Sequence, residues 1–226
     1  MLASIDTAVL TAGLIQFLIL LASLCVHEWA HAWTASRLGD PTARMAGRVT
    51  FNPMAHIDPI GTIAIPLFMV FVSASSGGGF GIIGWAKPVP VDARYFRKPV
   101  RDDLLVTMAG PFSNIVLCLL AALIGGLALR FVPDAQVVES FGLVRQVIQI
   151  NALLAVFNML PVPPLDGSHL LRHAVRMKIE TYIAFSRWGF LILIVLINIP
   201  VFRMAMYVAI VTVAQPFAIL AAMLAR

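Results

Sequence analysis

The chain has little charge for its length, and this scarcity is the first constraint on what it can be. Only 12% of its 226 residues are Asp, Glu, Lys or Arg, whereas 60% are hydrophobic. The mean hydropathy of +0.92 lies well above the range of water-soluble globular domains. The composition therefore excludes a soluble domain and predicts an all-α polytopic membrane protein, since helices satisfy their own backbone hydrogen bonds in lipid.

Cysteine is also scarce, and each of the two cysteines lies within an apolar run. Cys25 and Cys118 are too few for a disulfide framework, and they form no CxxC metal motif. Lys and Arg are lacking before the first apolar run, which begins at Ala8. We therefore expect no cleavable signal peptide at the start of the chain.

Apolar runs account for most of the sequence. A helix needs about 20 apolar residues to cross a bilayer, and five runs are long enough. They cover residues 8–38, 104–132, 141–160, 185–202 and 204–225. A sixth run, 60–73, is short and either crosses a thinned bilayer or is re-entrant. We expect five to six transmembrane helices.

The net charge of +5 is unevenly distributed. Basic residues gather in 37–48, 87–101 and 172–187, whereas 133–140 contains Asp134 and Glu139 and no basic residue. The positive-inside rule places the three basic segments in the cytoplasm, and the acidic turn and the N-terminus outside. The basic residues are thus expected to set topology and to contact anionic lipid headgroups, and we expect no nucleic-acid partner.

A zinc-binding pattern lies at the inner end of the first apolar run, in His27-Glu28-Trp29-Ala30-His31. On a helix His27 and His31 project from the same face, so both imidazoles can bind one zinc ion while Glu28 reaches a water molecule beside it. This pattern is typical of metalloproteases. Ionisable groups inside lipid persist mainly where they pair, bind an ion or line a polar cavity, which strengthens the prediction.

Two histidines leave a catalytic zinc one protein ligand short. The candidates for the third ligand are His56, Asp58, Asp166, His169 and His173. Asp166 follows three prolines and precedes a glycine, which favours irregular chain that can present a carboxylate to a cavity. His169 and His173 are a second one-turn pair, but they lack an intervening glutamate and lie in a stretch typical of an interfacial helix. The residues alone leave this choice open.

Three separated motifs resemble the site-2 protease family of intramembrane zinc metalloproteases. They are HEWAH at 27–31, AGPFSN at 109–114, and the stretch NMLPVPPLDG at 158–167. The resemblance implies that Asp166 is the third ligand, with one Zn²⁺ per chain. It also implies substrates that are transmembrane proteins or signal-peptide remnants, regulated intramembrane proteolysis, and a prokaryotic inner membrane. Segments 52–62 and 84–90 resemble the compact branch, and we expect neither a PDZ nor a CBS domain.

These observations predict a zinc metalloendopeptidase that hydrolyses peptide bonds within or near transmembrane segments. Glu28 is the expected general base. Asn114 and Asn158 are candidates for stabilising the oxyanion, although each can instead bond a neighbouring helix, and His56 can contact substrate or be an exposed loop residue. The alternatives are a metal-ion transporter, which has no need for Glu28, and a catalytically silent membrane scaffold. Oligomeric state is not predicted.

The domain organisation follows from this assignment. We expect a single membrane-embedded domain over residues 1–226, with a catalytic core at about 8–170 and accessory helices at about 185–225. The basic loops put the active site near the cytoplasmic side. The chain must return to that side after the run 60–73, through the glycine-rich stretch 77–85 and the extended segment 87–91. Such a strand-like segment is tolerated at membrane depth only beside protein or a wet cavity, so we expect it near the active site.

Overall fold

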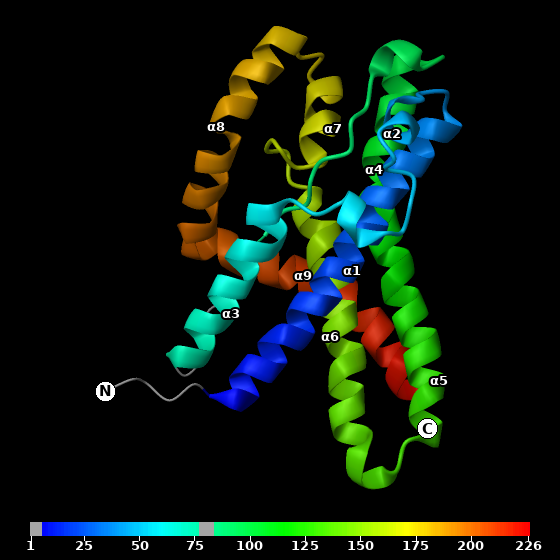
Figure 1. The fold of residues 1–226 in the computed structure, drawn as a ribbon, viewed down its shortest axis with the longest axis vertical. Coiled ribbons are helices and arrows are strands. Elements are labelled where there is room, and N and C mark those ends of the chain that lie inside the picture. The colour runs from blue at the N-terminus through cyan, green and yellow to red at the C-terminus, as the bar shows by residue number, and fades with distance from the viewer. Residues whose placement is uncertain (1–5, 77–83) are drawn as a thin grey trace.

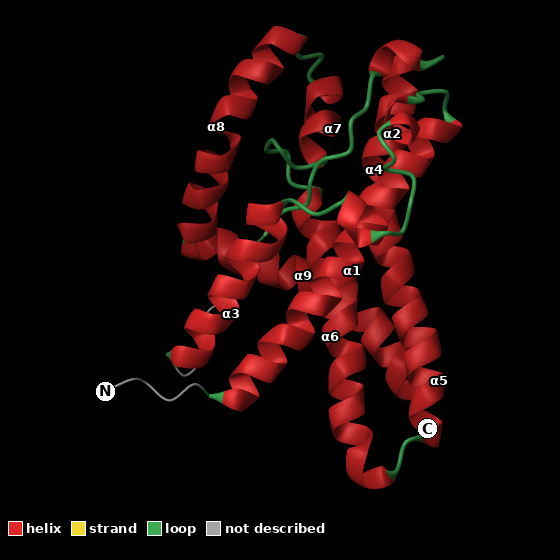
Figure 2. Cartoon of the chain, viewed as in Figure 1, coloured by secondary structure: helices red, strands yellow, loops and turns green. Residues whose placement is uncertain are grey.

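The computed structural model describes residues 6–76 and 84–226, and helices dominate both parts (Figures 1 and 2). The α-helices are α1 (Thr7–Arg37), α2 (Thr42–Met45), α3 (Ile65–Ser75), α4 (Pro99–Leu120), α5 (Gly126–Ala128), α6 (Asp134–Asn158), α7 (Gly167–Ala174), α8 (Ile179–Asn198) and α9 (Pro200–Leu224). Three 3₁₀ turns, η1 (Pro53–Ala55), η3 (Ala93–Tyr95) and η5 (Leu129–Phe131), and two π-helical turns, η2 (Pro59–Ala64) and η4 (Ala121–Gly125), complete the described helices. No strand occurs in these two ranges.

Five helical segments are long and apolar enough to cross a membrane. They are Thr7–Arg37, Pro99–Phe131, Asp134–Asn158, Ile179–Asn198 and Pro200–Leu224. This confirms the predicted all-α polytopic fold. The run predicted at 60–73 is the shorter helical segment Pro59–Ser75, which joins η2 to α3. Its length falls below the roughly 20 residues that a full crossing takes.

The starts of α4, α6 and α8 were predicted too late; α8, expected from residue 185, begins at Ile179. The segment expected from residue 104 begins at Pro99, and the acidic turn expected at 133–140 is wrong because α6 begins at Asp134. Proline suits a first helical position, and a carboxylate in the first turn is stabilised by the exposed N–H groups there. Hydropathy marks the apolar part of a helix but not such polar first turns.

The boundary between the last two helices also differs from the prediction. The sequence runs predicted a break at position 203, whereas α8 ends at Asn198 and α9 begins at Pro200. Ile199 between them has an extended backbone, because a residue before proline is disfavoured in the helical region. Figure 1 shows α9 leaving α8 at an angle and passing behind α1 and α6.

The core lies where α4, α6 and α9 pack together, with α1 crossing α4. Small side chains dominate the most buried cluster, which contains Cys118, Ala122, Ile148, Ala152, Ala214 and Ala221. Small residues let helix backbones approach closely, which matters in lipid because burial of apolar surface gives no drive between helices there. In contrast, α8 stands apart from α1 (Figure 1).

The segment predicted to be strand-like is extended chain without regular strand structure. Its backbone is held on one side by the preceding loop: the N–H of Trp85 donates to the carbonyl of Gly61 (3.1 Å), and that of Lys87 to the carbonyl of His56 (2.9 Å). The Thr62 hydroxyl donates to the Trp85 carbonyl (2.7 Å). Most of the predicted glycine-rich return, 77–83, lies outside the described residues.

Candidate metal centre

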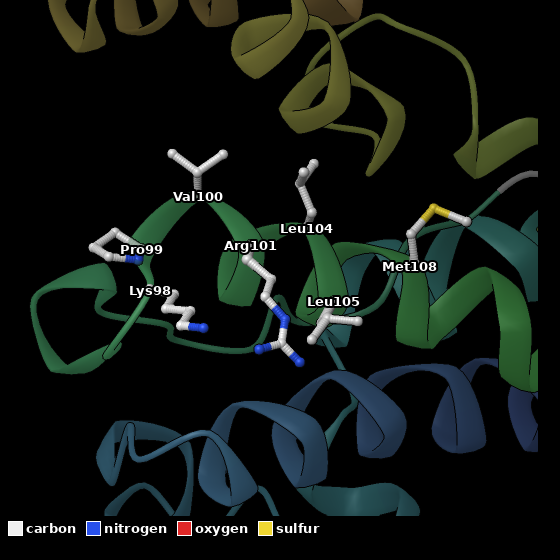
Figure 3. Close-up of a pocket in the computed structure, with 7 residues that line it drawn as sticks. All are labelled: Lys98, Pro99, Val100, Arg101, Leu104, Leu105 and Met108. Carbon is white, nitrogen blue, oxygen red and sulfur yellow. The ribbon is translucent and has the colours of Figure 1, made fainter.

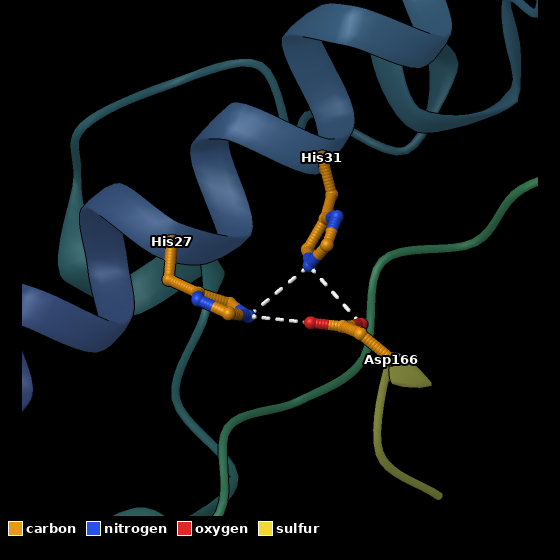
Figure 4. A group of neighbouring side chains, drawn as sticks. All are labelled: His27, His31 and Asp166. Atoms are coloured by element: carbon orange, nitrogen blue, oxygen red, sulfur yellow. Dashed lines mark hydrogen bonds and ion pairs between the residues drawn. The ribbon is translucent and has the colours of Figure 1, made fainter. Parts of the chain in front are cut away.

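Three potential metal ligands meet between α1 and the start of α7 (Figure 4). His27 and His31 lie one turn apart on α1, and their Nε2 atoms are 3.1 Å from each other. The two carboxylate oxygens of Asp166 lie 3.2 Å from Nε2 of His27 and 3.4 Å from Nε2 of His31. Within 6–76 and 84–226 this is the only group of three His, Cys, Asp or Glu side chains that can hold a metal ion.

Asp166 reaches the histidines because the chain folds back after α6. A Cβ on the next residue, Gly167, would lie 2.2 Å from the carbonyl oxygen of Met159, so only glycine permits this return. Val162 and Leu165, on either side of the loop, are buried against Leu193 of α8. The proline-rich segment thus forms a packed loop that presents its carboxylate inward.

A chain of hydrogen bonds determines which nitrogen of His27 carries the proton. The Asn151 amide donates to the Val147 carbonyl (2.9 Å), a group that can only accept, and also contacts Ser23. Asn151 Oδ1 therefore accepts from the Asn114 amide (2.9 Å), which leaves Asn114 Oδ1 to accept from Nδ1 of His27 (2.7 Å). With its proton on Nδ1, neutral His27 presents a lone pair at Nε2.

His31 is held in the same way, because its Nδ1 lies 2.7 Å from the backbone carbonyl of Val106. Two imidazole lone pairs and a carboxylate therefore face one another at short distance. The Oδ2 atom of Asp166 is buried and accepts no hydrogen bond from a described residue. A divalent cation relieves this repulsion, and two imidazoles with one carboxylate is a common catalytic zinc ligand set.

The charge of Asp166 fits the role of a ligand. Burial alone would raise the pKa of its carboxyl group, whereas the imidazoles of His31 and His27, when they are protonated in the absence of metal, lower that pKa well below its usual range; those protons are displaced when a metal ion binds. Asp166 is therefore ionised at neutral pH, as metal binding requires.

Glu28 lies beside this group and is not one of its ligands. Its side chain is half-buried and makes no hydrogen bond or ion pair with the residues that the structure describes. Its charge acts on buried Arg48, where burial lowers the pKa of the guanidinium and Glu28 opposes that shift. Arg48 in turn donates to the carbonyls of Lys87 and Pro88 (3.0 Å to Pro88). Arg48 therefore interacts with the charge of Glu28 and is also hydrogen-bonded to the backbone of the extended segment.

The remaining predicted contacts, Asn114, Asn158 and His56, lie outside the ligand group. Asn114 has its Oδ1 and one amide hydrogen engaged in the chain described above, and the Asn158 amide donates to the Leu154 carbonyl (3.0 Å). His56 is buried, with Nε2 donating to the Thr50 carbonyl (2.9 Å) and Nδ1 unbonded among the described atoms. Their roles toward substrate stay predictions. Asp58 caps η2 by accepting from Ile60 and so is not a ligand here.

The second histidine pair belongs to a different cluster. Oδ2 of Asp103, on α4, lies 3.4 Å from Nδ1 of His169, 2.6 Å from Nε2 of His173 and 3.0 Å from Arg172. A guanidinium in this position disfavours a metal ion. The cluster ties α7, and with it the start of the helix at Asp166, to α4.

Sequence reasoning gave no role at the centre to three residues that shape it: Gly110, which it noted only as part of the AGPFSN motif, Asn151 and Arg48. A Cβ on Gly110 would lie 2.3 Å from Nε2 of His31 and 2.6 Å from Nε2 of His27. Asn151 is one of several amides on α6, and nothing local marks it out, because its side-chain partners on α1 and α4 lie far away in sequence. Arg48 was interpreted only as a topology signal.

We predict that Gly110→Ala removes the metal. The added methyl group occupies the space that the two Nε2 atoms need, so zinc affinity should fall at least as much as when a ligand loses an outer-shell partner, about 10- to 100-fold. Zinc content of the purified protein measures this. Gly142→Ala is the matched control, since a Cβ there meets no atom within 4 Å. Equal zinc in both variants would contradict the geometry.

A hollow of about 630 Å³ on the first turns of α4 contains none of the candidate ligands. It is lined by Lys98, Pro99, Val100, Arg101, Leu104, Leu105 and Met108. Val100 and Leu104 project to one side of the helix and Arg101 to the other (Figure 3). Its lining has no His, Cys, Asp or Glu side chain, so it is not a second metal site.

Comparisons with known proteins identify relatives of the chain. Residues 132–196 match the model of peptidase family M50. The chain is 36% identical over 185 residues to a Bacillus subtilis protein named "Putative zinc metalloprotease YwhC", covering 80% of this chain and 78% of that protein. It is 34% identical to proteins named Rip2 from Mycolicibacterium smegmatis and Mycobacterium tuberculosis, and spans 65% and 58% of their lengths.

No solved structure gives a match. The family nevertheless follows from the 36% identity to YwhC over most of both chains and from the match to the family model. The chain belongs to peptidase family M50, the site-2 protease family.

Proposed function

We propose that this protein is an intramembrane zinc metalloendopeptidase that hydrolyses peptide bonds within or near the transmembrane segments of other proteins. One observation carries the proposal: His27, His31 and Asp166 converge in a bundle of apolar helices, with an unpaired carboxylate beside them. A structural zinc site would normally be closed by four protein ligands, whereas three leave a position for chemistry.

We assign a separate role in hydrolysis to each group of the centre. When bound, zinc supplies a Lewis acid that polarises a carbonyl and lowers the pKa of water to about 7. Glu28 accepts a proton from the attacking water and delivers it to the leaving nitrogen. Asn114 holds His27 in the tautomer that binds metal, and the Val106 carbonyl does the same for His31.

The substrate must be extended at the bond that is cut, because the backbone of an intact helix is already hydrogen-bonded. The extended segment beside the centre fits this need. The N–H groups of Trp85 and Lys87 donate hydrogen bonds to backbone carbonyls of the preceding segment. The N–H of Ala86, between them, bonds to no described residue. Successive residues of an extended chain face opposite sides, so the free edge can pair with an unwound substrate strand.

Removal of the metal tests the proposal. The purified protein in detergent or vesicles should cleave a single-span model substrate, and a zinc chelator should abolish the cleavage, which added Zn²⁺ should restore. If the protein instead carried zinc across the vesicle membrane and cleaved no substrate, it would be a transporter. Full cleavage in chelator would overturn the proposed chemistry.

We also propose that the centre faces the cytoplasm and that the membrane is the bacterial inner membrane. The basic segments support the orientation, and the bacterial source of the relatives supports the location. His27 lies about 30 Å along α1 from Thr7, so it approaches the opposite face from the helix start.

Cysteine labelling in intact cells checks the orientation. In a background without Cys25 and Cys118, Asp134→Cys should react with a membrane-impermeant reagent, whereas Met45→Cys should not. Both positions are exposed, Met45 at 83%, so accessibility to the reagent depends on the side of the membrane. Labelling of position 45 alone would reverse the topology. Lysed cells, in which both should react, provide the control.

A further inference from the structure

A second polar site lies among the membrane-spanning helices, apart from the metal ligands. It is a cavity of about 760 Å³ between α6 and α9, with a contribution from α1. Its polar lining comes from Gln16, Arg145, Gln146, Gln149, Tyr207 and Gln215. Apolar side chains of α6 and α9, including Ile150 and Ile219, make up the rest of its wall.

The polar groups of this cavity have no partners in the described protein. The side chains of Arg145, Gln149 and Gln215 are exposed, and neither these nor Gln16 makes a hydrogen bond or ion pair with a residue of 6–76 or 84–226. In the neighbouring Asn114–Asn151 chain, by contrast, both side chains are hydrogen-bonded within the protein. Charged side chains inside a membrane are costly and are normally paired, so the unpaired arginine indicates a missing anionic partner.

The depth of Arg145 in the membrane helps to distinguish two possible anionic partners, a lipid headgroup and a carboxylate on another transmembrane segment. The hydrogen bond between Ser23 and Asn151 fixes the relative height of α1 and α6. Gln16 and Arg145 each precede that pair by about two turns, roughly 10 Å, and the start of α1 lies about 13 Å further out. Arg145 thus lies inside the apolar zone. A carboxylate carried by another membrane-spanning segment can reach it there, whereas a lipid headgroup meets it only if the arginine side chain extends toward the membrane surface.

We infer that this cavity binds the transmembrane helix of a second membrane protein, one that carries an acidic side chain opposite Arg145. Arginine pairs with a carboxylate through two parallel hydrogen bonds, and the surrounding glutamine amides can bond further polar groups of the helix. Ile150 continues the wall inward, where it packs with Leu24 one turn before His27. A bound helix therefore lies along α1 and α6 in the direction of the metal centre. This binding does not depend on peptidase activity.

Binding of a designed helix tests the inference. The probe is a labelled leucine–alanine helix with one Asp about 13 Å from its outer end, and its counterpart with Leu there. Energy transfer to the full-length protein in zwitterionic vesicles measures affinity. The Asp probe should bind at least about tenfold more tightly than the Leu probe, and Arg145→Leu should remove that difference. Arg203→Leu, which removes an exposed arginine near the start of α9, should leave it intact.

A charge exchange guards against a variant that simply misfolds. Arg145→Glu should lose the Asp probe and gain affinity for a probe with Lys at the same place. Equal binding of the Asp and Leu probes to the unchanged protein would overturn the inference. So would an effect of Arg145→Leu only on bound anionic lipid, or only on self-association of the protein.

Discussion

Glu28→Gln should abolish peptide hydrolysis while zinc stays bound. The amide has nearly the shape of the carboxylate but cannot accept a proton, and general-base catalysis contributes about 10²- to 10⁴-fold to rates. His27, His31 and Asp166 are unchanged, so the metal should be retained. Turnover of a single-span model substrate and zinc content, measured on the same preparation, decide the prediction.

Glu139→Gln is the matched control for Glu28→Gln, because it makes the same change on an exposed residue at the outer part of α6. It should alter neither zinc content nor rate. Normal turnover by Glu28→Gln would remove Glu28 from the mechanism. Loss of zinc from that variant would show that the carboxylate supports the metal rather than the proton transfer.

The sequence predicted the parts of this structure that depend on local pattern. Apolar runs located the five long helices, because crossing lipid imposes a length on each. The one-turn spacing of His27 and His31 predicted that they share a helix face, and their Nε2 atoms meet. The resemblance, rather than the residues alone, singled out Asp166, since the sequence does not reveal where a proline-rich loop will fold back.

Contacts between distant segments could not be predicted from local pattern. The proton position of His27 depends on Asn151 and on the Val147 carbonyl, both on α6, and nothing in HEWAH indicates them. Arg48 looked like one of many cytoplasmic basic residues, but it is 3% exposed and holds the backbone of the extended segment. Helix ends were displaced for a simpler reason, because hydropathy does not detect polar capping turns.

Asp166→Ala should behave differently from Glu28→Gln, because it removes a ligand rather than a base. Zinc affinity should fall by more than the roughly 10- to 100-fold that loss of an outer-shell partner costs, and activity should fall with it. Metal content after dialysis against a weak chelator gives the affinity. Excess Zn²⁺ should partly restore the activity of Asp166→Ala only if His27 and His31 still bind the metal in that variant.

His169→Ala and His173→Ala are the controls for the ligand assignment. Each removes one partner of Asp103 and leaves the ion pair between Asp103 and Arg172, so α7 should stay attached to α4 and Asp166 should keep its place. Both variants should therefore retain zinc. If instead they lost the metal while Asp166→Ala kept it, the ligands would have to be sought around Asp103. The short contacts of Asp166 with both Nε2 atoms would then have no functional explanation.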